Sequence, residues 1–168
     1  MRCRTSVLLL MIVGTAWVGL SGLIELPVRV VYNASDSVPP GWYRIEPGAL
    51  PKVGELVLVR LPSEAAQLAS QRGYLPIEVP MLKPVFAVHP QRACAIGKRL
   101  LVGDGTAVQV RRHDSRGRPM PQWKGCRPLT EDELLLLSPL HADSFDSRYF
   151  GPVSTHTVLG TAHRLFAD

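Results

Sequence analysis

Hydrophobic and polar residues alternate along most of the chain after residue 28, a pattern typical of half-buried β-strands. Proline and glycine interrupt this alternation at short intervals, and no segment of this part shows a long helical period. The sequence therefore predicts a mainly β domain, with strands at residues 28–33, 41–45, 55–60, 81–88, 99–103, 106–111, 133–138 and 155–166.

One short helix and two hairpins complete the predicted elements. A helix is expected at residues 63–72, where Ser63 can cap the first turn and Gly73 can end the last one. Turn residues predict hairpins at residues 103–105 and 114–117. Because no repeat or linker interrupts them, residues 28–168 are expected to form one domain.

The first 27 residues have a different character. Residues 7–26 are almost entirely apolar and carry one charge, and about 20 helical residues span the roughly 30 Å hydrocarbon core of a bilayer. Arg2 and Arg4 precede this run, so the positive-inside rule predicts a cytoplasmic N-terminus. We expect residues 1–27 to be a single-pass anchor in the inner (cytoplasmic) membrane, with residues 28–168 in the periplasm. A cleavable secretory signal is the alternative, although this apolar run is longer than the usual core of such a signal.

The three cysteines agree with that topology. Cys3 would face the reducing cytoplasm, whereas Cys94 and Cys126 would both lie in the oxidising compartment. No second cysteine or histidine stands two to four residues from either, so their spacing fits no metal site. A Cys94–Cys126 disulfide is expected, worth roughly 3–4 kcal/mol in the chain-entropy account. No metal or cofactor is predicted.

Lys83 interrupts an otherwise apolar predicted strand, VPMLKPVFAV. The other three lysines lie beside proline, glycine or charged residues, where solvation is easy. Burial of an amine can lower its pKa by up to about 3–5 units, which would make Lys83 a usable general base. Alternatively, Lys83 lies on an edge strand and extends to water, a position that Pro84 would also favour.

Two serines, Ser35 and Ser37, stand directly before the turn Pro39-Pro40-Gly41. Serine is common near turns, and that is one interpretation. The other is that the prolines stiffen the segment and hold one hydroxyl still for chemistry, because a serine paired with a lysine base is a known alternative to the Ser-His-Asp triad.

The segment SFDSRYFGP, residues 144–152, is a dense polar cluster. Asp146 and Arg148 are two residues apart, so on an extended strand their side chains would share one face. Unless other groups join them, they would form an ordinary surface ion pair of little energetic value.

Taken together, these motifs resemble those of the type I signal peptidase family. SDSVPPG resembles the family's serine box, LKPVFAV its lysine box and SFDSRYFG its last box. They occur in the family's order over roughly residues 33–160. Within the family, PPGWYRI and the cysteine pair make the chain similar to the TraF branch, whose members serve conjugative transfer systems.

The resemblance implies a signal-peptidase-like β fold and a Ser-Lys dyad. Ser37 would be the nucleophile and Lys83 the general base. The hydroxyl of Ser35 and the backbone N–H of Ser37 would form the oxyanion hole. Ser144 would hydrogen-bond the lysine amine and orient it.

The last box would support the site. The resemblance implies that Asp146 and Arg148 brace it, and a more direct catalytic role of Asp146 stays open. The chain departs from the family pattern at Pro84, which follows the lysine, at residues 89–90 and at residues 141–143. These departures concern the substrate range rather than the Ser-Lys chemistry.

The implied function is a membrane-anchored serine endopeptidase that processes an exported precursor, the pilin of a conjugative transfer system, and either hydrolyses or cyclises it. Its partners would be that precursor and inner-membrane lipid, with no nucleic acid. The alternatives are a general type I signal peptidase and a non-catalytic periplasmic scaffold of a secretion apparatus.

The remaining charged features are interpreted as structural. The five histidines lie on different predicted elements and match no hydrolase or metalloprotease motif. The basic run at residues 111–118 contains an acid and a turn and lacks interleaved aromatic residues. It predicts a solvated hairpin tip that faces the membrane, rather than a nucleic-acid site.

Overall fold

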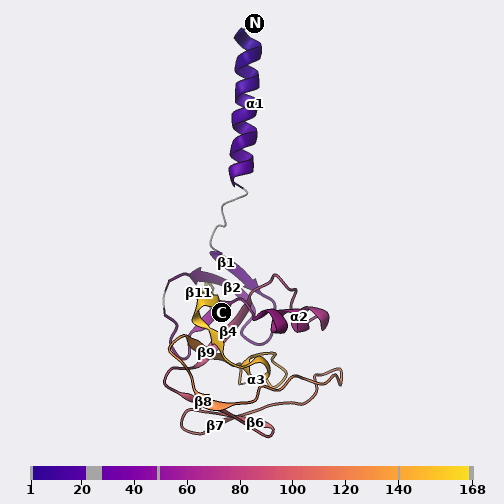
Figure 1. Ribbon diagram of the computed structural model, residues 1–168, viewed down its shortest axis with the longest axis vertical. Helices are drawn as coiled ribbons and strands as arrows, with labels where there is room; N and C mark the ends of the chain where they lie inside the picture. The colour runs from indigo at the N-terminus through magenta and orange to yellow at the C-terminus, as the bar shows by residue number, and fades with distance from the viewer. Residues whose placement is uncertain (1, 22–27, 49, 140, 167–168) are drawn as a thin grey trace.

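The computed structural model describes residues 2–21, 28–48, 50–139 and 141–166. Its strands form two antiparallel sheets, which confirms the prediction of a mainly β domain (Figure 1). The larger sheet has the order β1-β2-β11-β3-β4-β9-β10. Its strands are β1 (Val30–Asn33), β2 (Gly41–Glu46), β3 (Leu56–Val59), β4 (Met81–Val88), β9 (Glu133–Leu136), β10 (Val153–Ser154) and β11 (Val158–Arg164).

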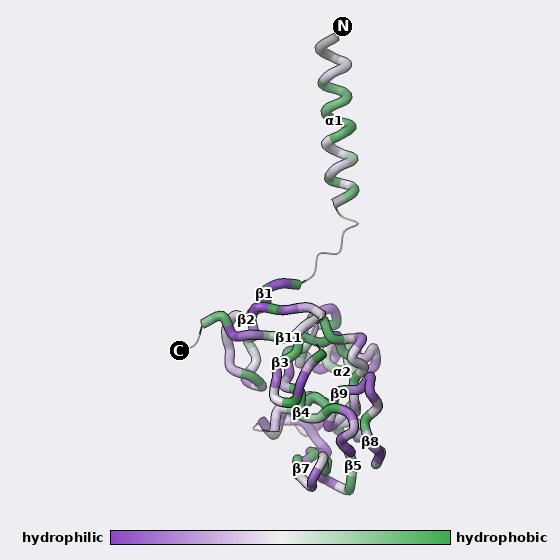
Figure 2. The backbone as a smooth tube through the Cα atoms, turned by 90° about the vertical axis from the view of Figure 1, so that its left-hand side faces the viewer, coloured by the Kyte–Doolittle hydropathy of each residue, from purple (hydrophilic) through white to green (hydrophobic). Residues whose placement is uncertain are grey.

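The smaller sheet has the order β7-β6-β5-β8 and lies at the end of the domain far from β1 (Figures 1 and 2). Cys94 on β5 pairs with Cys126 on β8, and the two cysteines form a disulfide. A tight turn at residues 103–105 joins β6 to β7, as predicted. The strands are β5 (Arg92–Ile96), β6 (Arg99–Val102), β7 (Thr106–Gln109) and β8 (Cys126–Pro128).

Every predicted strand has a counterpart, but the sequence pattern missed β5, β8 and β10. These three are short or poor in β-branched residues, so alternation alone does not identify them. Before β11, residues Thr155–Thr157 form the short 3-10 helix η1 instead of extended chain.

The helix α2 (Ser63–Gln71) confirms the predicted helix, and Gly73 follows its C-cap with a φ of 71°. The predicted Ser63 cap is wrong. Pro62 occupies the N-cap position without a side-chain hydrogen bond, and Ser63 is already helical. Proline brings a suitable φ to this boundary, so the helix begins there without a capping hydroxyl.

The strand β4 lies inside the larger sheet, between β3 and β9, with Lys83 opposite Val57. The alternative that placed Lys83 on an edge strand is therefore wrong. Pro84 has no backbone N–H to donate, but its position lies beside an irregular stretch of the β4–β9 pairing. Its carbonyl still accepts a hydrogen bond from Leu137 N–H.

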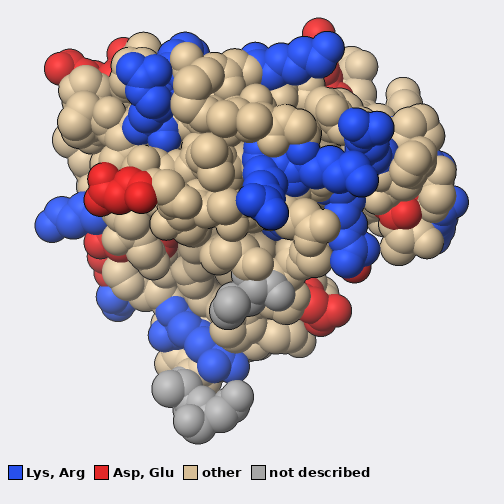
Figure 3. Space-filling view, turned by 90° about the horizontal axis from the view of Figure 1, so that it is seen from below, with Lys and Arg blue, Asp and Glu red and all other residues tan. Residues whose placement is uncertain are grey.

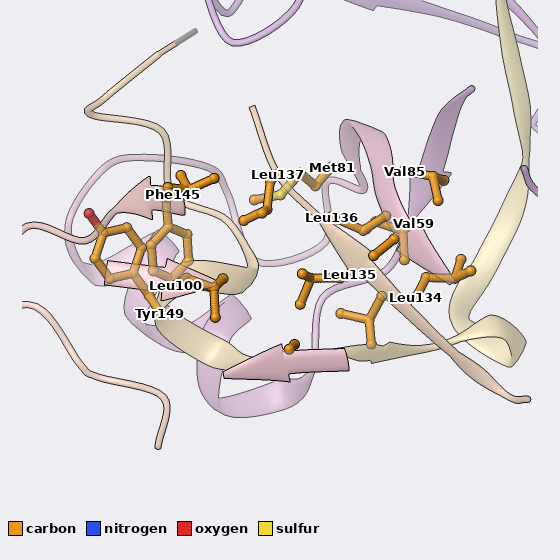
Figure 4. Packing of buried hydrophobic residues seen from close by; sticks show 14 of the residues in the cluster. Val59, Met81, Val85, Leu100, Leu134, Leu135, Leu136, Leu137, Phe145 and Tyr149 are labelled. Atoms are coloured by element: carbon orange, nitrogen blue, oxygen red, sulfur yellow. The ribbon is translucent and has the colours of Figure 1, made fainter. Parts of the chain in front are cut away.

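The two faces of the larger sheet pack against separate hydrophobic clusters. Figure 4 shows the main cluster, in which side chains of β3, β4 and β9 meet Phe145 and Tyr149. Met81 and Val85 face this main cluster, whereas Leu82 packs on the opposite side with Val38 and Tyr43. Lys83 shares the parity of Met81 and Val85, so the pleat directs its amine toward the main core.

The helix α1 (Arg2–Ser21) stands apart from the strands in Figure 1, and Figure 2 shows hydrophobic colouring along it. Within the ranges given above, no helix combines the length and the apolar character needed to cross a bilayer. Residues 22–27 of the predicted anchor lie outside the described residues. The division into an anchor at 1–27 and a domain at 28–168 stays a prediction.

The hairpin at residues 114–117 forms, but its base is not simply solvated. Asp114 accepts hydrogen bonds from the Tyr74 hydroxyl and from Arg118 Nε, the latter at 2.7 Å, and the Arg118 guanidinium lies 5.5 Å from the Tyr74 ring centre. Arg72 at the end of α2 donates to Pro119 O. The hairpin is thus attached to the end of α2. Seen from the side opposite α1, Lys and Arg side chains gather in patches on the surface (Figure 3).

Candidate active site

A cleft of about 1000 Å³ collects most of the predicted site residues. One wall is the segment of residues 34–40 between β1 and β2, called here the serine loop. The start of β4 and residues 141–145 form other walls. Ser35, Ser37, Lys83 and Ser144 all line this cleft, although they come from positions over 100 residues apart.

Val38 and Tyr43 help to fix the serine loop to the sheet. Val38 is buried in the second hydrophobic cluster, and the Tyr43 hydroxyl on β2 donates to Pro39 O at 2.7 Å. Ser35 Oγ lies 3.1 Å from Ser37 Oγ, so the two serines contact each other at the cleft. Ser37 is half-buried and Ser35 is exposed. The two consecutive prolines keep the loop stiff, as the sequence predicts.

Lys83 is buried, with 4% of its surface exposed. Its Nζ donates to Ser144 Oγ at 2.7 Å and lies 3.5 Å from Ser138 Oγ. Burial lowers the pKa of Lys83 from 10.5 to about 8, the negative charge of Asp146 raises it, and the positive charge of Arg148 lowers it. Burial has the largest of these effects, and no carboxylate among the described residues forms an ion pair with the amine.

Asp146 and Arg148 form a buried ion pair instead of the surface pair considered above. Arg148 Nη2 lies 2.7 Å from Asp146 Oδ2 and Arg148 Nε lies 2.8 Å from Asp146 Oδ1, which is a two-pronged geometry. The expected extended conformation is wrong, because residues Ser147–Phe150 form the short helix α3 with Asp146 as its N-cap. Aspartate favours this position because its carboxylate accepts from the Arg148 N–H, here at 3.2 Å.

The same pair organises the loop that carries Ser144. Arg148 donates to the carbonyls of Ser138 at 3.0 Å and His141 at 2.9 Å, and Asp146 accepts from Ser138 N–H at 3.1 Å. Ser144 N–H in turn donates to His141 O at 3.1 Å. The ion pair therefore holds the segment between β9 and α3 in the shape that brings the Ser144 hydroxyl to the lysine amine.

The structure thus assembles two groups at one cleft: Ser35 with Ser37, and Lys83 with Ser144, whose loop the Asp146–Arg148 pair holds in shape. Among the hydrogen bonds of the described chain, none joins Ser37 Oγ to Lys83 Nζ. Catalytic hydrogen bonds are often long in unliganded enzymes and form only when substrate is bound.

Two polar residues of this region were not predicted. Ser138 contacts the lysine amine and also binds both members of the ion pair, yet the sequence pattern placed it only at the end of a strand. Asn33 contacts the serine loop, and its position at the start of NASDSVPPG is the only sequence signal that could have found it.

The arrangement can support proton transfer. With a pKa of about 8, roughly one molecule in ten has a neutral lysine amine at pH 7, compared with about one in 2,500 for an unperturbed lysine. A hydroxyl in the same cleft could lose its proton to this amine. A peptide segment would fit between the mainly polar serine loop on one side and the apolar side chains of Leu75, Val79 and Met81 on the other.

Comparison with known proteins agrees with the motifs. The family described as "Signal peptidase, peptidase S26" matches residues 2–166. The chain is 34% identical over 166 residues to "Conjugal transfer protein TraF" of Agrobacterium fabrum, covering 91% of this chain and 92% of that protein. It is 36% identical over 144 residues to "Probable conjugal transfer protein TraF" of Sinorhizobium fredii, covering 79% and 74%.

A signal peptidase I from Enterococcus faecalis, a solved structure, aligns with a TM-score of 0.39 and 15% identity, covering 67% of this chain and 97% of that one. The resemblance drawn from the serine, lysine and last boxes is confirmed by the family match and the two relatives.

Proposed function

Because the chain belongs to the signal peptidase family, peptidase S26, we propose that it is a membrane-anchored serine endopeptidase that uses Ser37 as nucleophile and Lys83 as general base. The main support for this proposal is the following observation. A buried lysine with a lowered pKa opens onto the same cleft as a serine from a stiff loop. Buried titratable groups with perturbed pKa values that open onto a cleft are typical of functional sites.

The reaction would begin when the neutral Lys83 amine takes the proton of Ser37 Oγ, which attacks the carbonyl carbon of the scissile peptide. The Ser37 N–H and the Ser35 hydroxyl would donate to the resulting oxyanion. The Lys83 ammonium would then give its proton to the leaving amine as the C–N bond breaks, which leaves an ester on Ser37. Ser144 would keep the lysine amine oriented through both transfers.

The acyl-enzyme could be resolved in two ways. Water, deprotonated by Lys83, releases a linear product. If the amine at the N-terminus of the same product attacks instead, the chain closes into a ring. Both routes use the same residues. The mass of the product, and not the structure of the site, therefore distinguishes hydrolysis from cyclisation.

For the substrate we propose the pilin precursor of a conjugative transfer system. The similarity to two proteins named for conjugal transfer supports this choice. The cleft supports a peptide substrate because polar groups line one side and apolar residues the other.

We also propose that α1 anchors the protein in the inner membrane, with a cytoplasmic N-terminus and a periplasmic peptidase domain. The described side chains of α1 are exposed, including Leu10 and Trp17 at 73% and 74%, and an apolar surface of this kind needs another apolar environment. Labelling of Cys3 by a membrane-impermeant thiol reagent only after the inner membrane is broken would support this topology. Labelling in cells whose outer membrane alone is permeabilised would contradict it.

The catalytic proposal is tested by incubating the purified full chain with a pilin precursor, beside Ser37→Ala and Lys83→Met. Lys98→Met is the matched control, because Lys98 is exposed. We expect both site variants to lose at least about 100-fold in processing rate while the control keeps it. Equal processing by all four proteins would overturn the dyad and favour a non-catalytic scaffold. Mass spectrometry then identifies the product as linear or as lighter by one water.

A further inference from the structure

Asn33 is the only asparagine of the chain and the last residue of β1. It is buried, and its side chain is directed entirely at the serine loop. Nδ2 donates to the carbonyls of Ser35 at 2.8 Å, Val38 at 2.9 Å and Pro39 at 3.3 Å. Oδ1 accepts from Ser35 N–H at 3.1 Å and from Ser35 Oγ at 2.8 Å. One carboxamide thus makes five contacts to the segment that carries the proposed nucleophile.

The loop needs such a partner for a physical reason. It leaves the sheet, so its carbonyls lose their strand partners, and its two prolines donate no hydrogen bonds. A primary amide offers two donor hydrogens and an accepting oxygen on one rigid plane, so a single side chain can satisfy backbone groups on both sides of Ser37. A hydroxyl or a carboxylate could not replace it, since neither presents the same donors and acceptor together.

We propose that Asn33 is a positioning residue for the peptidase reaction, which fixes the Ser35 hydroxyl and the backbone around Ser37 before substrate binds. This inference rests on the proposed function. Asn33 does not reach the reacting atoms itself and acts through Ser35 and Ser37.

The position of Ser35 Oγ makes the role specific. Ser35 Oγ lies 2.8 Å from Asn33 Oδ1 and 3.1 Å from Ser37 Oγ. While Ser35 donates its proton to Asn33, its oxygen can only accept from Ser37. When the oxyanion forms, the Ser35 proton must turn from Asn33 Oδ1 to the oxyanion, while the oxygen itself stays in place. Asn33 therefore has to accept strongly enough to hold this oxygen and weakly enough to release its proton.

Changing Asn33 need not unfold the loop. Val38 remains buried in the second hydrophobic cluster, and the Tyr43 hydroxyl still binds Pro39 O. The positioning role can therefore be separated from a purely structural one.

Asn33→Asp is the primary variant, because it is nearly isosteric and replaces the donating group by an oxygen that faces three carbonyls. Asn33→Ala is the second variant, which removes all five contacts without adding charge. Gln71→Glu is the matched control, since it makes the same change of charge on an exposed position of α2. The kcat and KM of precursor processing are measured in the full chain, at a temperature at which circular dichroism shows each variant folded.

We expect kcat to fall about 10- to 100-fold in both Asn33 variants, with KM changed by less than about 3-fold. Deletion of an oxyanion donor costs about 100- to 1,000-fold in kcat, and here the Ser35 hydroxyl is displaced and not deleted. In the Ser35→Ala background, the Asn33→Asp change should cost less than it does in the parent chain, since coupled residues are non-additive. The control should match the parent chain.

An unchanged kcat in both Asn33 variants, or losses that multiply fully with that of Ser35→Ala, would overturn the positioning role. Ser37→Ala is measured in parallel. If it too keeps full activity, the proposed function fails; if it is inactive while the Asn33 variants are normal, only the inference about Asn33 fails.

Discussion

The serine loop and the surroundings of Lys83 face one cleft but are stabilised by different forces. Ser37 is half-buried on a loop that neutral hydrogen bonds and one buried valine hold in place. Lys83 is buried in an interior strand, and the buried Asp146–Arg148 ion pair acts on its pKa. The proposed nucleophile therefore depends on local backbone geometry, whereas the proposed base depends on burial and on the charges of Asp146 and Arg148.

This difference has a consequence for mutation. Neutral hydrogen bonds are worth about 0.5–1.5 kcal/mol each, so single changes in the serine loop should leave the fold intact. If one member of a buried ion pair is removed, the other charge is left without a partner in the poorly solvating interior. Substitutions of Asp146 or Arg148 should therefore lower the stability of the fold, and the loss of stability should in turn lower the activity.

The largest effect is expected from Arg148→Met. The change leaves the Asp146 carboxylate, which is fully buried, without its cation and should lower the free energy of unfolding by about 3–5 kcal/mol. Arg44→Met is the control, because its pair with Glu46 is exposed and is worth about 0–1 kcal/mol. Urea unfolding measures both. Similar losses in the two variants would contradict the difference between buried and surface pairs.

The next effect concerns pH. With the pKa of Lys83 near 8, kcat/KM should rise by about tenfold per pH unit below that value and level off above it. Between about pH 8 and 10.5 the unfolded chain holds the lysine proton while the folded chain has released it, so the free energy of unfolding should also rise with pH in this window.

Rate measurements from pH 6 to 10 on the parent chain, with Lys98→Met as control, check this profile. A rate that still rises about tenfold per pH unit up to pH 10, as expected for an unperturbed lysine with a pKa of about 10.4, would show that burial does not act on the amine as the structure indicates.

A smaller effect is expected at Gly151, the C-cap of α3. Gly151 has a φ of 82°, and a Cβ there would lie 2.5 Å from Trp123 Cδ1. Gly151→Ala should cost about 1–3 kcal/mol of unfolding free energy through overpacking, in addition to backbone strain. Gly117→Ala also has a positive φ, 74°, with open space around it, so it shows the cost of a positive φ without overpacking. Equal losses in thermal unfolding would show that Trp123 moves away without cost.

The smallest effect is expected from Tyr43→Phe. Loss of the hydrogen bond from the Tyr43 hydroxyl to Pro39 O should reduce stability by about 0.5–1.5 kcal/mol. Because the ring and Val38 stay packed, kcat should fall by less than in the Asn33 variants. Tyr32→Phe changes an exposed hydroxyl on the neighbouring strand and serves as the control for stability. A larger loss of kcat at Tyr43 than at Asn33 would reverse the ranking of the two contacts.

Much of the fold was predictable because β-strands leave a local signature. The alternation at residues 81–88 placed β4 with its correct bounds, and Gly103 and Gly105 marked the hairpin between β6 and β7. The strand β8 was not predictable, because Cys126–Pro128 is held by pairing with β5 and not by its own composition. Likewise, α3 was misread as extended, since a four-residue helix has no period and depends on the Asp146 cap.

The candidate site divides in the same way. Ser37, Lys83, Ser144, Asp146 and Arg148 could be selected from short motifs and their order along the chain. Ser138 and Asn33 could not, because their importance lies in contacts with residues that the motifs had already identified.

By itself the sequence determined which residue types are available for the proposed Ser-Lys chemistry, the family to which the chain belongs, and the β character of the domain. The tertiary structure decided that Lys83 lies in the interior of the sheet, that Asp146 and Arg148 are buried together, and that the two motifs meet at one cleft. The reason is physical. Side-chain chemistry and strand alternation are local properties, whereas burial, and with it the pKa of a lysine, depends on segments that only folding brings together.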